Sequence, residues 1–289
     1  MIDINEIHTF GTSHTQGGGF EWNDTNNPKK LELLDKFYSH LDIPKKQEFF
    51  SWPGQLHQKT GVEVINHGQS GFGDEKIYRS FYKLLEDKNF YNSINKKLFI
   101  FEFAEMGRKE YFCNSINDYI ILNYWGKNEQ GHFHDYEKYD ENNLDFAFTN
   151  DFYNHNVILN SNELKNKYFN FFKKSWSPHI YQQKISMDAI GFISFLETLS
   201  INYLIVNSPF FRLYDMNTYI SWGITEKEVE FRNGKGDMLG MVIKEKLRIS
   251  DETNGEYQDG HAGYEGNNII SDYVIKKINK TYNLTKIII

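Results

Sequence analysis

The chain has 289 residues, of which 39% are hydrophobic and 25% are charged, and it contains only 5 prolines. This composition excludes a disordered, collagen-like or low-complexity chain and predicts a folded globular protein with a sizeable core. Its 39 acidic residues outnumber its 32 lysines and arginines, and the net charge of −7 argues against nucleic acid as a partner. Neither composition nor charge specifies an oligomeric state.

The ends and the cysteine content predict no membrane attachment and no cofactor. The first ten residues, MIDINEIHTF, have acidic residues in place of a basic stretch and an apolar run, so we expect no secretion signal. No window reaches the roughly 18 apolar residues of a membrane span. Cys113 is the sole cysteine, which excludes an internal disulfide and a Cys-x-x-Cys metal or redox motif. The cellular location stays open.

Short apolar runs alternate with amphipathic stretches, a rhythm typical of a parallel sheet covered by helices. Strands are predicted over 7–10, 62–66, 98–103 and 203–206. Helices are predicted over 30–41, 75–85, 189–199 and 268–278, with Asp74 as the N-cap of the second. Two polar stretches, at about 111–167 and 212–250, interrupt this rhythm, and we interpret them as insertions in a single domain of residues 1–289.

The first candidate site is the segment GTSHTQG (11–17), which directly follows the first predicted strand. Ligands of open α/β sheets bind where strands end, and a serine on such a turn exposes both its hydroxyl and its backbone N–H. Because Gly, Ser and Thr are common turn residues, an ordinary strand-to-helix turn also explains this segment when it is taken alone.

Two further polar segments follow the same logic. NHGQSGFG (66–73) lies between a predicted strand and a helix, and it lacks the Gly-Lys-Ser/Thr ending of a P-loop, so nucleotide binding is not predicted. QDGHAG (258–263) precedes the last predicted helix. There the carboxylate of Asp259 can fix the tautomer of His261. Taken alone, the first of these segments is equally well explained as a glycine-rich turn, and the second is better explained as a polar surface turn.

In chain order, a serine, a backbone donor, an aspartate and a histidine form a complete set for nucleophilic acyl transfer. These blocks resemble those of the SGNH hydrolases, also called GDSL-type esterases and lipases, which are Gly-Asp-Ser, Asn-x-Gly-x-Ser-Gly and Asp-x-x-His. The resemblance covers block order and spacing over most of the chain, but neither interrupting stretch. It implies a three-layer α/β/α sandwich with a parallel, flavodoxin-like sheet.

Carried over to this sequence, the resemblance implies that Ser13 is the nucleophile, that His261 is the base and that Asp259 orients it. The backbone N–H groups of Ser13 and Gly71 would form two legs of an oxyanion hole. The remaining candidates, for substrate binding, are His14, Glu105 and Arg108.

The third leg of the oxyanion hole is where this sequence departs most from the family. The family supplies an Asn from a Gly-x-Asn-Asp block after the third strand, and that Asn is absent here. Glu105 falls near its place, where an ionised carboxylate repels a developing oxyanion unless it is protonated or paired with Arg108. This departure argues against efficient catalysis.

Two smaller departures affect the other blocks. Thr12 replaces the aspartate of the first block, and Gly260 alone separates the last block's Asp and His where two residues are usual. A one-residue spacer in an extended loop still puts both side chains on the same side. Glu256 and Asp251 remain alternatives for the orienting carboxylate.

The leading hypothesis is an SGNH-like serine esterase that forms an acyl-enzyme from a small-molecule or glycan ester, such as a carbohydrate O-acetyl ester. The 111–167 stretch would shape its pocket. The alternative is a non-catalytic SGNH-fold protein that binds glycans or has a structural role, for example in a virion. A metal-dependent enzyme using His132, His134 and Asp135 is the weakest hypothesis, because these three ligands lack a distant fourth and a triad hydrolase needs no metal. The acyl and alcohol groups of the substrate are not specified by the sequence.

Overall fold

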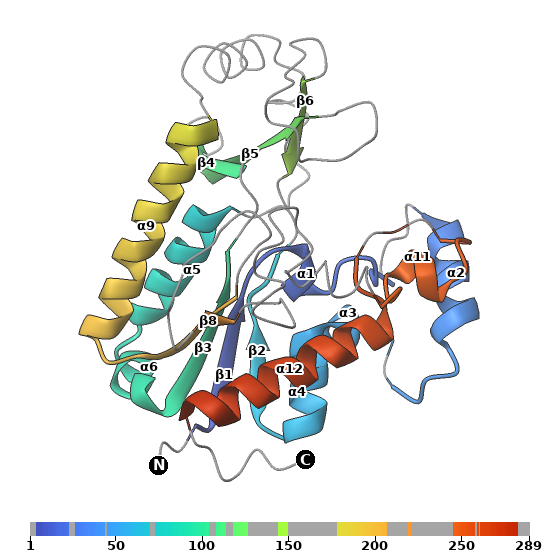
Figure 1. Cartoon of the computed structure of the whole chain (residues 1–289), viewed down its shortest axis with the longest axis horizontal. Helices are drawn as coiled ribbons and strands as arrows, with labels where there is room; N and C mark the ends of the chain where they lie inside the picture. The colour runs from blue at the N-terminus through green and yellow to red at the C-terminus, as the bar shows by residue number, and fades with distance from the viewer. Residues whose placement is uncertain are drawn as a thin grey trace.

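A computed structural model describes residues 4–22, 27–43, 45–69, 73–103, 108–113, 118–126, 144–149, 178–206, 219–220, 245–257, 259 and 261–282. At its centre lies an all-parallel sheet with the strand order β2-β1-β3-β7-β8 (Figure 1). Its strands are β1 (Glu6–Phe10), β2 (Glu63–Asn66), β3 (Lys97–Glu102), β7 (Asn202–Val206) and the two-residue β8 (Tyr219–Ile220). Counted within the sheet, this order is 2-1-3-4-5, a common order of doubly wound α/β proteins.

Helices cover both faces of this sheet. On one face, α4 (Trp52–Thr60) and α12 (Tyr264–Tyr282) pack on alternate residues of β1 and β3, such as Ile7 and Leu98. On the other, α5 (Asp74–Leu85) and α9 (Pro178–Thr198) pack on a mainly aromatic set that includes Phe10 and Phe99. Because successive strand residues point to opposite faces, one short apolar run serves both layers. The α/β prediction is confirmed, and the arrangement is consistent with three α/β/α layers (Figure 1).

A third apolar cluster lies beside the sheet, next to α1 (Ser13–Gln16). It joins α2 (Pro28–Tyr38), α3 (Gln47–Phe50) and α11 (Ile249–Glu252). Its buried members are Phe20, Leu34, Tyr38, Phe50 and Ile249. The cluster thus ties the segment after α1 to the segment before α12, which are far apart in sequence.

The predicted strands and helices are present, with shifted ends. Gly73, and not Asp74, is the N-cap of α5, so Asp74 is instead the first helical residue. The helix α4 was not predicted, and two further short elements, α6 (Lys88–Asn92) and a 3-10 turn (Ile94–Lys96), lead into β3.

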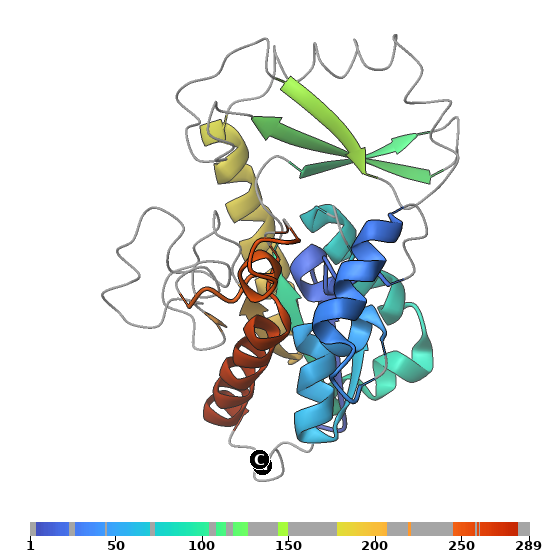
Figure 2. The same ribbon diagram turned by 90° about the vertical axis from the view of Figure 1, so that its right-hand side faces the viewer.

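The stretches interpreted as insertions contain regular structure. Strands β4 (Arg108–Cys113), β5 (Asp118–Gly126) and β6 (Leu144–Thr149) form a separate antiparallel sheet in the order β4-β5-β6. Figure 2 shows this sheet beyond the end of the molecule at which the parallel strands finish, on the same side as α1. In the second stretch, β8 extends the parallel sheet. Residues Tyr219–Ile220 of that stretch therefore belong to the central sheet.

Within the described part of the chain, no helix has the length and apolarity needed to cross a membrane.

Candidate functional site

The segment that contains Ser13 turns sharply at the carboxyl end of β1. Ser13 begins the single-turn helix α1, which ends at Gly17 with a left-handed backbone (φ +89°). The carbonyl of Ser13 accepts hydrogen bonds from the N–H groups of Gly17 and Gly18, at 3.0 and 2.6 Å. The candidate serine is therefore fixed in a tight turn at the sheet edge where ligands of α/β proteins bind.

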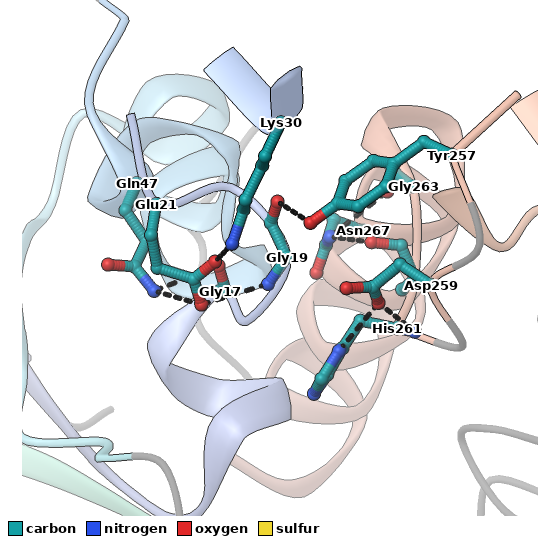
Figure 3. Close-up of polar contacts among 11 residues, drawn as sticks. Gly17, Gly19, Glu21, Lys30, Gln47, Tyr257, Asp259, His261, Gly263 and Asn267 are labelled. Carbon is teal, nitrogen blue, oxygen red and sulfur yellow. Dashed lines mark hydrogen bonds and ion pairs between the residues drawn. The ribbon is translucent and has the colours of Figure 1, made fainter. Parts of the chain in front are cut away.

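Asp259 and His261 form the pair that the last block predicts (Figure 3). The carboxylate Oδ1 of Asp259 lies 2.7 Å from Nδ1 of His261 and also accepts the backbone N–H of His261 at 2.8 Å. The imidazole side chain is 30% exposed and the carboxylate 17%. The ring is thus oriented from the protein interior while it stays accessible from solvent.

The charge state of Asp259 sets the tautomer of His261. Burial raises the pKa of Asp259. The hydrogen bonds that Asp259 accepts from His261, and the attraction of a protonated imidazole, lower it by more, so the pKa is lowered overall. An ionised carboxylate only accepts hydrogen bonds, so the proton of a neutral imidazole sits on Nδ1. Nε2 is then unprotonated, as a general base requires.

The imidazole of His261 faces the turn that follows Ser13. A Cβ atom placed on Gly18 would come 2.7 Å from Nε2, so only glycine leaves room for the ring at this position. Figure 3 shows the ring pointing away from Asp259 toward the short helix α1. Since Gly18 is hydrogen-bonded to Ser13, the structure brings His261 to the turn that carries the predicted nucleophile.

Backbone hydrogen bonds hold the Asp259–His261 segment in place. The N–H of Ile249 donates to the carbonyl of His261 at 2.9 Å, and that of Ser250 donates to Asp259 at 3.1 Å. Asn267, which is buried on α12, donates from its amide to Ala262 and Gly263. The side chain of Asn267 also accepts the backbone N–H of Trp52, which ties this loop to α4.

A second set of polar contacts fixes the glycine-rich loop after α1 (Figure 3). Glu21 accepts the N–H of Gly19 at 3.0 Å and forms an ion pair with Lys30. Gln47 donates to the carbonyl of Gly17 at 3.0 Å. Burial lowers the pKa of Lys30, but Glu21 more than offsets this effect, so the pKa is raised. The ion pair between Lys30 and Glu21 therefore holds the loop in place, because Glu21 also accepts the N–H of Gly19.

The second block lies alongside the first. Asn66 donates from its amide to the carbonyl of Thr15 at 2.7 Å, and its Oδ1 accepts the N–H of Gly68 at 2.9 Å. The N–H of Gln69 donates to the carbonyl of Gly11 at 3.0 Å. These bonds bring the segments 11–16 and 66–69 together, as the resemblance implies for its first two blocks.

A chain of polar side chains runs from the second block across the α5–α9 face of the sheet. Nε2 of His67 lies 2.9 Å from Nδ1 of His8, which contacts Glu6 through Nε2, and Glu6 pairs with Lys97 at 2.6 Å. Burial, together with the repulsion that a protonated His8 would exert, lowers the pKa of His67 to about 4. Burial also lowers the pKa of His8, although Glu6 opposes the shift. The histidine pair is therefore held neutral.

The alternative orienting carboxylates are engaged elsewhere. Asp251 accepts from the guanidinium of Arg248 at 2.8 and 3.1 Å. Glu256 forms an exposed ion pair with Lys36. Of the three carboxylates that the sequence left open, Asp259 is thus the one in contact with His261.

Several predicted site residues lie outside the described residues, namely Gly71, Glu105, Gly260, His132, His134 and Asp135. For His14, in α1, and Arg108, the first residue of β4, only the backbone is described. Among the residues described, no group of three His, Cys, Asp or Glu side chains is arranged to hold a metal ion.

A groove of about 690 Å³ opens next to the site, on the side of β2. Its lining comes from the end of α1, from α3 and α4, and from the second block, with Gln16, Gln47, His57, Asn66 and Gly68 among its members. Neither Ser13 nor His261 lines this groove. The groove thus adjoins the segment that carries the predicted nucleophile and does not contain the predicted catalytic side chains.

Two residues that shape the site were not predicted from the sequence. Asn267 lies within an amphipathic helix, where nothing in the pattern marks it. Glu102 ends the buried strand β3 and contacts Thr12 and Thr15, on either side of Ser13. An acidic residue inside the apolar run LFIFEF was the available signal for Glu102.

No family model, curated protein or solved structure matches the chain. The resemblance to SGNH hydrolases therefore rests on the sequence blocks alone.

Proposed function

We propose that the chain is a serine esterase of the SGNH type, with Ser13 as nucleophile, His261 as general base and Asp259 as the group that orients it. The observation that carries the proposal is the contact between Asp259 and Nδ1 of His261, with the opposite edge of the ring turned to the Ser13 turn. The approach of His261 to the turn after Ser13 joins two segments that lie about 250 residues apart in the chain, which an accidental polar turn does not explain.

The proposed reaction has two halves. Ser13 Oγ attacks the ester carbonyl carbon while Nε2 of His261 takes the hydroxyl proton, and the carbonyl oxygen becomes an oxyanion. The intermediate then collapses, the bond to the alcohol breaks, and the imidazolium gives its proton to the departing alcohol. Water, deprotonated by the same imidazole, hydrolyses the acyl-enzyme, which releases the acid and restores Ser13.

Asp259 acts in both halves through the imidazole. Its carboxylate stabilises the imidazolium that forms transiently, and it keeps Nε2 unprotonated before each attack. In the proposal the backbone N–H groups of Ser13 and Gly71 bind the oxyanion. The substrate class is a small-molecule or glycan ester, with carbohydrate O-acetyl esters as the first to be tested.

Hydrolysis of a short-chain aryl acetate tests the proposal. We expect activity in the wild type, and a loss of at least about 10³-fold in Ser13→Ala and in His261→Ala. Ser39→Ala, at the exposed end of α2, is the matched control and should retain full activity. Circular dichroism establishes that each variant is folded.

The alternative function predicts a different outcome. A folded wild type that hydrolyses neither the aryl acetate nor acetylated glycans would overturn the esterase proposal and favour a glycan-binding or structural protein. Direct titration with unmodified glycan fragments would then be the next measurement.

A further inference from the structure

The acidic side chain of Glu102 lies directly beneath the turn that carries Ser13. Glu102 is the last residue of β3, the strand between β1 and β7, and it is only 4% exposed. Its Oε1 accepts the hydroxyl of Thr12 at 2.9 Å, and its Oε2 accepts the hydroxyl of Thr15. Both threonines are buried, with Thr12 3% and Thr15 0% exposed. One carboxyl group therefore holds the residue before Ser13 and the residue two positions after it.

This contact redirects the side chain that would otherwise cap α1. Thr12 occupies the N-cap position, where a threonine hydroxyl ordinarily accepts an N–H of the first helical turn. Here Thr12 makes no such capping bond, and its hydroxyl donates to Glu102 instead. The hydroxyl of Thr12 therefore ties the start of α1 to β3 and makes no contact with the helix's own first turn.

The surrounding packing leaves little room for the turn to move. A Cβ atom on Gly11 would lie 2.6 Å from Oε2 of Glu102, so the backbone just before the turn lies directly against the carboxyl group. On the other side of the turn, the side-chain amide of Asn66 donates to the backbone carbonyl of Thr15. The turn is therefore held between the ends of β3 and β2.

We propose that Glu102 is a positioning residue for the nucleophile. Its hydrogen bonds to Thr12 and Thr15 fix the orientation of the turn that carries Ser13. The inference rests on the proposed esterase function, because a position for Ser13 has a kinetic meaning only if Ser13 reacts. In this role the acidic group comes from β3 and reaches the turn through the hydroxyls of Thr12 and Thr15.

The test compares variants that keep or remove each hydrogen bond. In Glu102→Gln a single amide oxygen replaces the two carboxylate oxygens that accept the hydroxyls of Thr12 and Thr15. Thr15→Val removes the hydroxyl donor of Thr15 and conserves the shape of the side chain. A displacement of about 1 Å at a reacting group can cost about 10²-fold in rate, so we expect kcat on an aryl acetate to fall roughly 10- to 100-fold in each. KM should change less than about threefold.

Thr15→Ser restores the hydroxyl and is expected to recover most of the kcat that Thr15→Val loses. The double variant Thr15→Val/Glu102→Gln should lose little more than Glu102→Gln alone, because both changes break the same contact. Thermal unfolding separates this role from a purely structural one. If Glu102 were purely structural, the substitutions would lower the melting temperature and leave the kcat of the folded protein unchanged.

Wild-type kcat in folded Glu102→Gln and Thr15→Val would overturn the positioning role and leave the esterase proposal intact. A wild type without activity would overturn the esterase proposal and this role with it. If Glu102→Gln does not fold, the comparison between Thr15→Val and Thr15→Ser still decides the question.

Discussion

Nε2 of His261 lies against the backbone of Gly18, within 2.7 Å of the place that a Cβ atom on that glycine would take. The predicted base thus reaches the Ser13 turn only because a residue without a side chain stands there. This relationship accounts for the middle glycine of the GGG sequence after α1, whereas the left-handed backbone of Gly17 and Gly19 accounts for the other two.

We predict that Gly18→Ala displaces the imidazole and lowers kcat/KM for an aryl acetate by roughly tenfold or more. The control is Gly191→Ala on α9, where an added Cβ meets nothing within 4 Å. That helical glycine should gain about 0.5–1 kcal/mol of stability with no change in activity. Equal activity in the two variants would show that His261 does not work in the observed orientation.

Asp259→Asn removes the charge that sets the tautomer of His261, and an amide can also donate to Nδ1 and leave the proton on the wrong nitrogen. We expect kcat to fall by roughly 10²–10⁴-fold, in line with serine hydrolases in which the orienting carboxylate was changed in this way. Glu256→Gln should leave kcat unchanged, since Glu256 pairs with Lys36 at the surface. A loss in the Glu256 variant and none in the Asp259 variant would reassign the orienting group.

Stability should fall as the solution is acidified from pH 6.5 to pH 4. The folded protein holds the pKa of His67 at about 4, whereas its ordinary value is 6.5. The unfolded chain therefore takes up a proton first, so the free energy of unfolding declines through this window and levels off below it. The full contribution is on the order of 3 kcal/mol at 1.36 kcal/mol for each pKa unit.

Urea titrations at a series of pH values, on the wild type and on His67→Gln, measure this contribution. The difference in unfolding free energy between the two proteins should change across this window and be constant above it. A difference that is the same at pH 7 and pH 4 would contradict the buried, neutral state of the His8–His67 pair.

Loss of the carboxylate of Glu21 should destabilise the loop after α1, because Lys30 would remain buried without its partner. Breaking a buried pair costs about 3–5 kcal/mol, and since the side chain of Glu21 is 34% exposed we expect about 1–3 kcal/mol for Glu21→Gln. Lys45→Gln is the control, since it breaks an exposed pair with Asp35 and should cost less than about 1 kcal/mol. Urea denaturation measures both, and equal costs would contradict this account of the loop.

The parallel sheet was predictable from the sequence because its signals are local. Each of the predicted strands is a short apolar run, and most are followed by a turn and an amphipathic helix, so periodicity alone identified β1, β2, β3 and β7. The helix α4 was missed because Pro53 and Gly54 resemble a break. In fact the proline lies in the first turn of the helix, where it is tolerated, and the hydroxyl of Ser51 caps the end by accepting the N–H of Gly54.

The contacts that support the candidate site depend on pairings that one sequence does not reveal. The strands β4, β5 and β6 pair with one another across a polar stretch, and antiparallel pairing leaves only a weak alternation in so mixed a sequence. The Asp259–His261 pair was predictable because the two residues are neighbours in sequence. The contacts of Glu102 with Thr12 and Thr15 were not, since they span 90 and 87 residues.

Reaction with a serine-directed fluorophosphonate, followed by mass spectrometry of the intact protein and its peptides, tests whether Ser13 is an activated nucleophile. We expect a single adduct on Ser13, which forms rapidly in the wild type, is abolished in Ser13→Ala and forms much more slowly in His261→Ala. A folded wild type that forms no adduct, or one that carries the adduct on another residue, would contradict the assignment of Ser13 as an activated nucleophile.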